Sequence, residues 1–113
     1  MDEEIINAVR KFNSERNWDQ FHDGKDLALS LVLEASELLE VYQWSDKDTE
    51  CLDKLDKSKE ELADVFLYAI QLSMHYDIDI PSIIKEKMKK NAAKYPVEKA
   101  RDSKEKYNVL KNR

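Results

Sequence analysis

Residues 27–44 read LALSLVLEASELLEVYQW, a run that is apolar almost all the way around a helix except for one line of polar side chains. That line includes Glu34 and Glu37. Residues 62–74 (LADVFLYAIQLSM) follow the same pattern, with Asp64 as their only charge. A helix that is apolar on nearly every side is expected to be buried. The two stretches therefore predict two helices at the centre of the fold.

The acidic side chains form two pairs with the same spacing, Glu34-x-x-Glu37 and Glu61-x-x-Asp64. Residues three apart on a helix share one face, so each pair can present two carboxylates to a single point. Two such pairs facing each other would make an oxygen cage for a divalent cation. The spacing alone leaves a second interpretation open, in which each acidic line is an ordinary solvated helix face.

The types of side chain in these pairs narrow the choice of metal. All four are oxygen donors, without His or Cys, which favours a hard ion such as Mg²⁺ or Mn²⁺ over zinc. A di-iron bundle would need Glu-x-x-His pairs, and neither pair ends in His. Because Mg²⁺ usually shares its coordination shell with substrate phosphates, such a cage favours a polyphosphate substrate.

The composition indicates a single all-α domain over residues 1–113. The chain has one Gly and two Pro, and no stretch alternates between apolar and polar residues as a strand would. Periodicity and turn residues predict a four-helix bundle, with a loop at residues 18–24 and a basic, polar tail at residues 97–113. The four helices are expected at residues 2–17, 26–44, 55–76 and 81–95.

The two central helices carry more apolar surface than a four-helix monomer of this size can cover. We therefore expect a homo-oligomer, either a dimer or a tetramer. The N-terminal residues do not resemble a signal peptide, and no apolar run approaches the ~20 residues that a bilayer requires. We expect a cytoplasmic protein without a membrane partner. The single cysteine, Cys51, excludes a disulfide framework.

Charge is distributed unevenly along the chain, whose net charge is −5. Residues 85–113 carry a net charge of +7, and residues 1–84 carry −12. The basic segment is either a solvated helix face with its tail or a source of counter-charge for phosphates. Nucleic acid is not an expected partner, because the acidic body would repel a polyanion.

Several further motifs occur in a fixed order around the acidic pairs. They are ERNWDQFH at residues 15–22, Gln43-Trp44 after the first pair, Tyr68 after the second, NAAKYPV at residues 91–97, Ala100-Arg101 and Lys106-Tyr107. This ordered set resembles the MazG-like all-α nucleoside triphosphate pyrophosphohydrolase family, and most closely its dCTP pyrophosphatase branch. The resemblance extends from Glu15 to Tyr107.

The resemblance implies an enzyme that hydrolyses dCTP, or a related modified nucleotide, to the monophosphate and pyrophosphate. Its Mg²⁺ ligands would be Glu34, Glu37, Glu61 and Asp64. Among these, Glu34 is our choice for the carboxylate that takes a proton from the attacking water.

The resemblance also implies two sets of substrate-binding residues. The groups expected around the base are Trp18, Phe21, His22, Trp44 and Tyr68. The groups expected on the phosphates are Asn91, Lys94, Tyr95, Arg101, Lys106 and Tyr107. Some relatives carry a run of arginines where this chain has Ala92, Ala93 and Lys94. A lysine cannot hold two oxygens in a fork as arginine does, which weakens the expected phosphate clamp.

Other interpretations remain open at this point. Within the superfamily, the substrate could be dUTP or another triphosphate. A phosphoribosyl-ATP pyrophosphatase fits less well, because the aromatic loop at residues 18–22 matches the dCTP branch. Trp44 and Tyr68 could serve as core or interface residues, since large aromatic side chains supply burial wherever they lie. From a different class, the chain could be a non-enzymatic helical oligomerisation module with acidic pairs on its surface.

Overall fold

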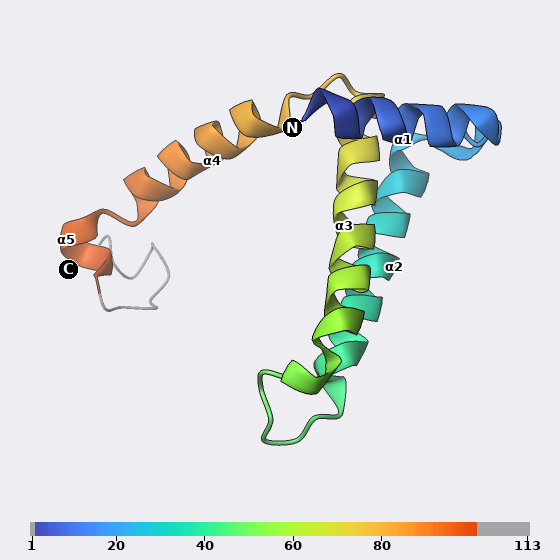
Figure 1. The fold of residues 1–113 in the computed structure, drawn as a ribbon. Coiled ribbons are helices and arrows are strands. Elements are labelled where there is room, and N and C mark those ends of the chain that lie inside the picture. Colours follow the sequence, from blue (N-terminus) through green and yellow to red (C-terminus); the bar gives the residue numbers. More distant parts are fainter. Residues whose placement is uncertain (1, 102–113) are drawn as a thin grey trace. The chain divides into compact units, whose positions relative to one another are not determined.

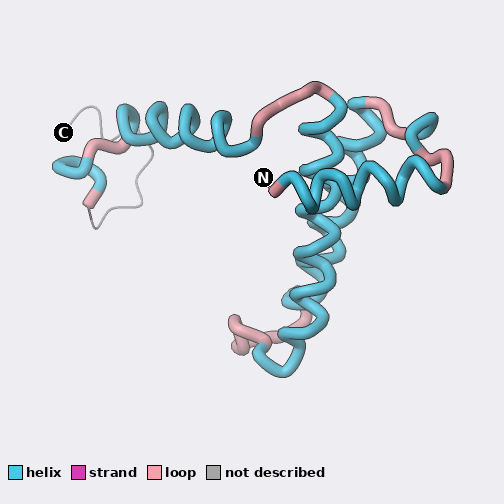
Figure 2. Tube along the Cα trace, turned by 45° about the horizontal axis from the view of Figure 1, so that its top comes forward, coloured by secondary structure: helices cyan, strands magenta, loops and turns pink. Residues whose placement is uncertain are grey.

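The structure, a computed structural model, describes residues 2–101, and helices account for most of them (Figures 1 and 2). No strand occurs within this range, so the all-α class is confirmed. None of the helices found there is long and apolar enough to cross a lipid bilayer. The elements in chain order are α1 Glu3–Glu15, η1 Asp19–Phe21, α2 Gly24–Gln43, η2 Leu52–Lys54, α3 Leu55–His75, α4 Ile80–Lys94 and α5 Val97–Ala100.

The four expected helices are all present; α3 begins at Leu55 as predicted, and capping residues move the starts of the other three by one or two residues. Asp23 accepts a hydrogen bond from the Asp26 N–H at 2.8 Å, so α2 begins within the expected loop. Asp79 caps α4 in the same way, and Pro81 lies in the first turn of that helix. The segment expected to be a tail begins with the short helix α5, for which Pro96 is the N-cap.

The chain divides into two compact units, residues 1–78 with α1 to α3 and residues 79–113 with α4 and α5. In the first unit, α2 and α3 lie side by side and are joined by residues 44–54 (Figure 1). The helix α1 crosses the end of this hairpin where α2 begins and α3 ends. The expected single domain stays a prediction.

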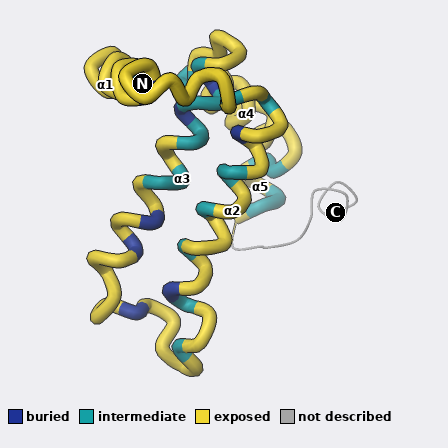
Figure 3. The backbone as a smooth tube through the Cα atoms, turned by 90° about the vertical axis from the view of Figure 1, so that its right-hand side faces the viewer, coloured by how far each residue is buried: buried dark blue, intermediate teal, exposed yellow. Residues whose placement is uncertain are grey.

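The core of the first unit is small. Its buried apolar side chains include Leu27 and Val41 of α2 and Ile70 of α3. A hydrogen bond of 3.0 Å between the Tyr42 and Ser58 hydroxyl groups also joins α2 to α3. Figure 3 accordingly shows few buried positions along α2 and α3, separated by exposed and intermediate ones.

The central helices are therefore much less buried in the single chain than their sequences predict. Four apolar side chains of α2 are more than half exposed: Leu29, Val32, Leu33 and Leu39. On α3, Phe66 is 54% exposed. Exposed apolar faces of this extent are typical of surfaces that pack against another molecule. They support the expected homo-oligomer, which stays a prediction.

Candidate functional site

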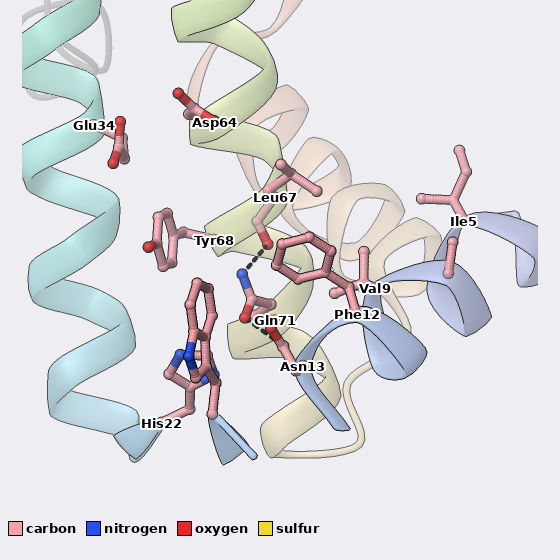
Figure 4. Close-up of a pocket in the computed structure, with 12 residues that line it drawn as sticks. Ile5, Val9, Phe12, Asn13, His22, Glu34, Asp64, Leu67, Tyr68 and Gln71 are labelled. Carbon is pink, nitrogen blue, oxygen red and sulfur yellow. Dashed lines mark hydrogen bonds between the residues drawn. The ribbon is translucent and has the colours of Figure 1, made fainter. Parts of the chain in front are cut away.

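Four carboxylates from α2 and α3 converge where the two helices run side by side. Glu34 and Glu37 lie one turn apart on α2, and Glu61 and Asp64 lie one turn apart on α3. An oxygen from each side chain lies within 4.8 Å of an oxygen from every other. Figure 4 shows Glu34 and Asp64 facing each other across the space between the helices. We call these four residues the carboxylate cluster.

Two oxygens of the carboxylate cluster are buried without a hydrogen-bond partner. They are Oε2 of Glu34 and Oε2 of Glu61, which no donor contacts among the residues that the structure describes. Buried polar atoms are nearly always paired, so an orphaned carboxylate oxygen indicates a missing ligand. An all-oxygen donor set fits a hard divalent cation such as Mg²⁺ or Mn²⁺. The carboxylate cluster could therefore hold such an ion.

Neighbouring charges shift the pKa values of two carboxylates of the cluster in opposite directions. Nζ of Lys57 lies 2.9 Å from Oε1 of Glu61, and this interaction lowers the pKa of the Glu61 carboxyl and raises that of Lys57. Glu37 instead has carboxyl neighbours. A side-chain hydrogen bond with Glu34, the charge of Glu34 and then contact with Glu61 raise the pKa of Glu37 to about 7. Without a cation, Glu37 is therefore partly protonated near neutral pH.

An apolar cavity of about 470 Å³ adjoins the carboxylate cluster, and Glu34 and Asp64 form part of its wall (Figure 4). This volume is typical of pockets that bind small molecules. Carboxylates at the edge of an apolar cavity suit a ligand with one apolar and one highly charged end. The lining residues are Ile5, Ala8, Val9, Phe12, Asn13, Trp18, His22, Glu34, Asp64, Leu67, Tyr68 and Gln71.

The turn after α1 brings Trp18 into the wall of this cavity. Asn17 has a φ of 53°, a left-handed conformation that Asn adopts more readily than most residues. The N–H of Asn17 donates to the carbonyl of Ser14 at 3.1 Å. The N–H of Trp18 donates to the carbonyl of Asn13 at 3.0 Å, which completes a Schellman motif. The indole then packs edge-on against Phe12, with 5.7 Å between ring centroids.

Comparison with known proteins shows the family to which this chain belongs. A family model described as MazG-like matches residues 29–110, a range that contains all of the carboxylate cluster. The chain belongs to the MazG-like family. It is 38% identical to dCTP pyrophosphatase 1 of Mus musculus over 96% of its length, and 34% identical to that of Homo sapiens over 96%. It spans 66% of the length of these curated relatives.

A solved structure supports the same assignment. A pyrophosphatase from Archaeoglobus fulgidus is 39% identical in sequence to this chain, with a TM-score of 0.78. The match covers 83% of this chain and 91% of that protein. The fold is therefore pyrophosphatase-like as well as all-α.

This MazG-like chain gathers three of the five groups expected around a base. Trp18, His22 and Tyr68 all line the apolar cavity. Phe21 lies in η1, is 62% exposed and does not line it. Trp44 lies at the other end of α2 and is 85% exposed. The substrate-binding roles of all five stay predictions.

The residues expected on the phosphates lie outside the first unit. Four of them belong to the second unit of the chain: Asn91, Lys94, Tyr95 and Arg101. The other two, Lys106 and Tyr107, lie outside the described residues. Their phosphate contacts stay predictions.

The structure reveals one polar feature of the cavity that sequence reasoning missed. Nδ2 of Asn13 donates to Oε1 of Gln71 at 2.7 Å, which joins α1 to α3 within the cavity wall (Figure 4). Asn13 is only 6% exposed. Nothing in the spacing of two amides 58 residues apart signals their contact, and only their position on the inward faces of α1 and α3 could have suggested it.

Proposed function

We propose that this chain is a Mg²⁺-dependent nucleoside triphosphate pyrophosphohydrolase that converts dCTP, or a modified cytosine nucleotide, to the monophosphate and pyrophosphate. The observation that carries the proposal is the carboxylate cluster at the edge of an apolar cavity, in a member of the MazG-like family. The base would occupy the cavity and the phosphates would lie towards the carboxylates. The similarity to dCTP pyrophosphatase 1 supports the choice of substrate.

The side chains of the cavity suit a base. Trp18 and Tyr68 offer aromatic faces on its wall, and stacking of a base on an aromatic ring contributes about 1–3 kcal/mol. His22 lines the same cavity and offers a nitrogen to a polar edge of the ligand. The apolar surroundings would exclude water from the bound base.

The carboxylates suit the chemistry at the phosphates. A bound Mg²⁺ would polarise phosphoryl oxygens and lower the pKa of water. Glu34 belongs, like Asp64, to both the carboxylate cluster and the cavity wall, and we keep Glu34 as our choice for the carboxylate that would accept a proton from water beside the substrate. Glu37 and Glu61 also line a second cavity of about 510 Å³ with Lys54 and Lys57. These lysines would provide counter-charge for the departing phosphates.

The alternatives are separated by different observations. Glu61, with an exposed fraction of 7%, is too buried for an acidic pair that merely decorates the surface of an oligomerisation module. The aromatic cavity wall agrees better with the dCTP branch than with a phosphoribosyl-ATP pyrophosphatase. Hydrolysis of dUTP or another triphosphate remains the second candidate, because stacking alone is tolerant of base identity.

The test is product analysis by ³¹P NMR, with purified protein, Mg²⁺ and a panel of dNTPs and NTPs. We expect monophosphate and pyrophosphate as products, with dCTP as the preferred substrate. The Asp64→Asn variant, which keeps the size of the side chain but removes one charge, should show no turnover and an unchanged helical CD spectrum. Diphosphate and orthophosphate as products, or no turnover by the unmodified protein, would contradict the proposal.

A further inference from the structure

The hydrogen-bonded amides of Asn13 and Gln71 form a polar site within the otherwise apolar part of the cavity wall. Asn13 is more than nine-tenths buried, and both residues line the cavity. Figure 4 shows the Gln71 amide beside Phe12 and Asn13. Buried polar groups in a ligand pocket are few, and they usually fix the orientation and identity of the ligand. We call these two residues the amide pair.

The orientation of the Gln71 amide is fixed by its neighbours. Its Nε2 donates to the carbonyl of Leu67 at 3.3 Å, and its Oε1 accepts from Nδ2 of Asn13 at 2.7 Å. A backbone carbonyl can only accept, so the nitrogen of Gln71 must be the atom that faces Leu67. Inverting the Gln71 amide would lose the bond to Leu67 and would place the Nε2 group of Gln71 against Nδ2 of Asn13, so that two donors faced each other.

The amide pair still has hydrogen-bonding capacity for a ligand. A primary amide offers two N–H donors and two acceptor lone pairs, and each internal bond uses one. Cytosine presents an amino donor next to an acceptor nitrogen, whereas uracil and thymine present a carbonyl acceptor next to an N–H donor. A freely rotating amide would pair with either edge. A fixed one distinguishes them.

We propose that the amide pair reads the polar edge of the base and sets the preference between amino-pyrimidine and oxo-pyrimidine nucleotides. This inference rests on the proposed function and names the residues that would decide its substrate. Glu34 and Asp64 border the same cavity, so a triphosphate held at the carboxylate cluster would leave its base within this wall. Stacking on Trp18 and Tyr68 would hold any base there, and the amide pair would select one.

The competing role for these amides is purely structural, as a link between α1 and α3. A structural link would affect stability and would change turnover of every substrate by the same factor. A base-reading contact changes the ratio between substrates. The ratio of kcat/KM values for dCTP and dUTP therefore separates the two roles.

The experiment measures kcat and KM for dCTP and dUTP in the unmodified protein and in Gln71→Met, which keeps the length of the side chain but removes its amide. The matched control is Gln20→Met. Nε2 of Gln20 also donates to a backbone carbonyl, that of Asn17 at 3.0 Å, but Gln20 does not line the cavity. Thermal unfolding of all three proteins monitors stability.

We expect the unmodified protein to prefer dCTP by at least about tenfold, within the range that a bidentate base contact provides. Gln71→Met should reduce this preference to within about threefold, through a higher KM for dCTP with kcat changed less than about twofold. Gln20→Met should keep the full preference. An equal loss for both substrates in Gln71→Met, or an unchanged ratio, would overturn the inference while leaving the proposed function intact. Failure of the unmodified protein to hydrolyse either nucleotide would contradict both the inference and the proposed function.

Discussion

The pKa of the Glu37 carboxyl is strongly raised by its neighbours. Its pKa is raised to about 7 from an ordinary value of 4.5, first by Glu34 and then by Glu61. The folded protein therefore binds a proton at Glu37 more tightly than the unfolded chain does. The stability that this proton contributes is fully present below about pH 4.5 and is lost as the pH rises towards 7.

We expect the metal-free protein to become less stable between pH 5 and pH 7, because Glu37 ionises beside other carboxylates. Urea unfolding in EDTA, across this range, measures the effect as a falling midpoint. Glu37→Gln should flatten the profile, since it removes the titrating group. Glu61 does not affect the stability profile between pH 5 and pH 7. Lys57 lowers the pKa of the Glu61 carboxyl, so the stability that this ion pair contributes is lost only at more acidic pH.

The control for this measurement is Glu40→Gln, an exposed carboxylate on the same helix that lies outside the carboxylate cluster. It should keep the pH dependence of the unmodified protein. If Glu37→Gln and Glu40→Gln gave the same profile, the strong coupling of Glu37 to the cluster would be refuted.

Individual residues of the site were predictable to different degrees. The spacing predicted two pairs of carboxylates, because residues three apart share one face of a helix, but the assignment of all four to one metal site came from the family resemblance. Trp18, His22 and Tyr68 came from the family resemblance. These three residues line one cavity because the chain turns at Asn17 in a left-handed conformation, which apolar periodicity does not predict. The amide pair of Asn13 and Gln71 was missed, because a contact between different helices leaves no pattern within either one.

At the scale of elements, the helices were easier to predict than their ends and their burial. The apolar runs identified α2 and α3 correctly, whereas the Asp23 cap moved the start of α2 by two residues relative to the prediction. The expected burial was not reached in the single chain. Apolar periodicity predicts that a helix face is buried, but it does not predict whether the same chain or a second copy of it covers that face.

The exposed apolar face of α2 leads to a prediction about assembly. We expect the protein to be a homo-oligomer, and Leu33→Glu to dissociate it, because a charge in an apolar contact loses its hydration. Leu33 is 64% exposed in the single chain, so the helical content of the variant should be nearly unchanged. Light scattering at micromolar concentration measures the assembly.

The matched control for Leu33→Glu is Leu52→Glu. Leu52 is an equally apolar residue that is 73% exposed, but it lies in η2, between the helices rather than on the apolar face. Leu52→Glu should leave the oligomer intact. An unmodified protein that is strictly monomeric at this concentration would show that the apolar face has another role.

For the molecule as a whole, the proposed function requires the carboxylate cluster to be a metal site rather than a group of mutually repelling acids. Two helices that belong to a small core bring four carboxylates together, which is unfavourable unless a cation neutralises them. In the proposed function, the apolar cavity beside them would bind the uncharged end of the substrate. We therefore expect binding of the metal, the base and the phosphates to be linked through Glu34 and Asp64. These two residues belong to the carboxylate cluster and also line the apolar cavity.

Metal binding by the carboxylate cluster can be tested by thermal unfolding with and without millimolar Mg²⁺, for the unmodified protein and Asp64→Asn. A cation that binds only the folded state stabilises it by about 2.7 kcal/mol at 100 times its Kd, which corresponds to a rise in Tm on the order of 10 °C for a chain of this size. We expect that rise in Tm in the unmodified protein and its loss in Asp64→Asn. Equal Tm values with and without Mg²⁺ in the unmodified protein, or the same rise in both proteins, would contradict metal binding by the carboxylate cluster.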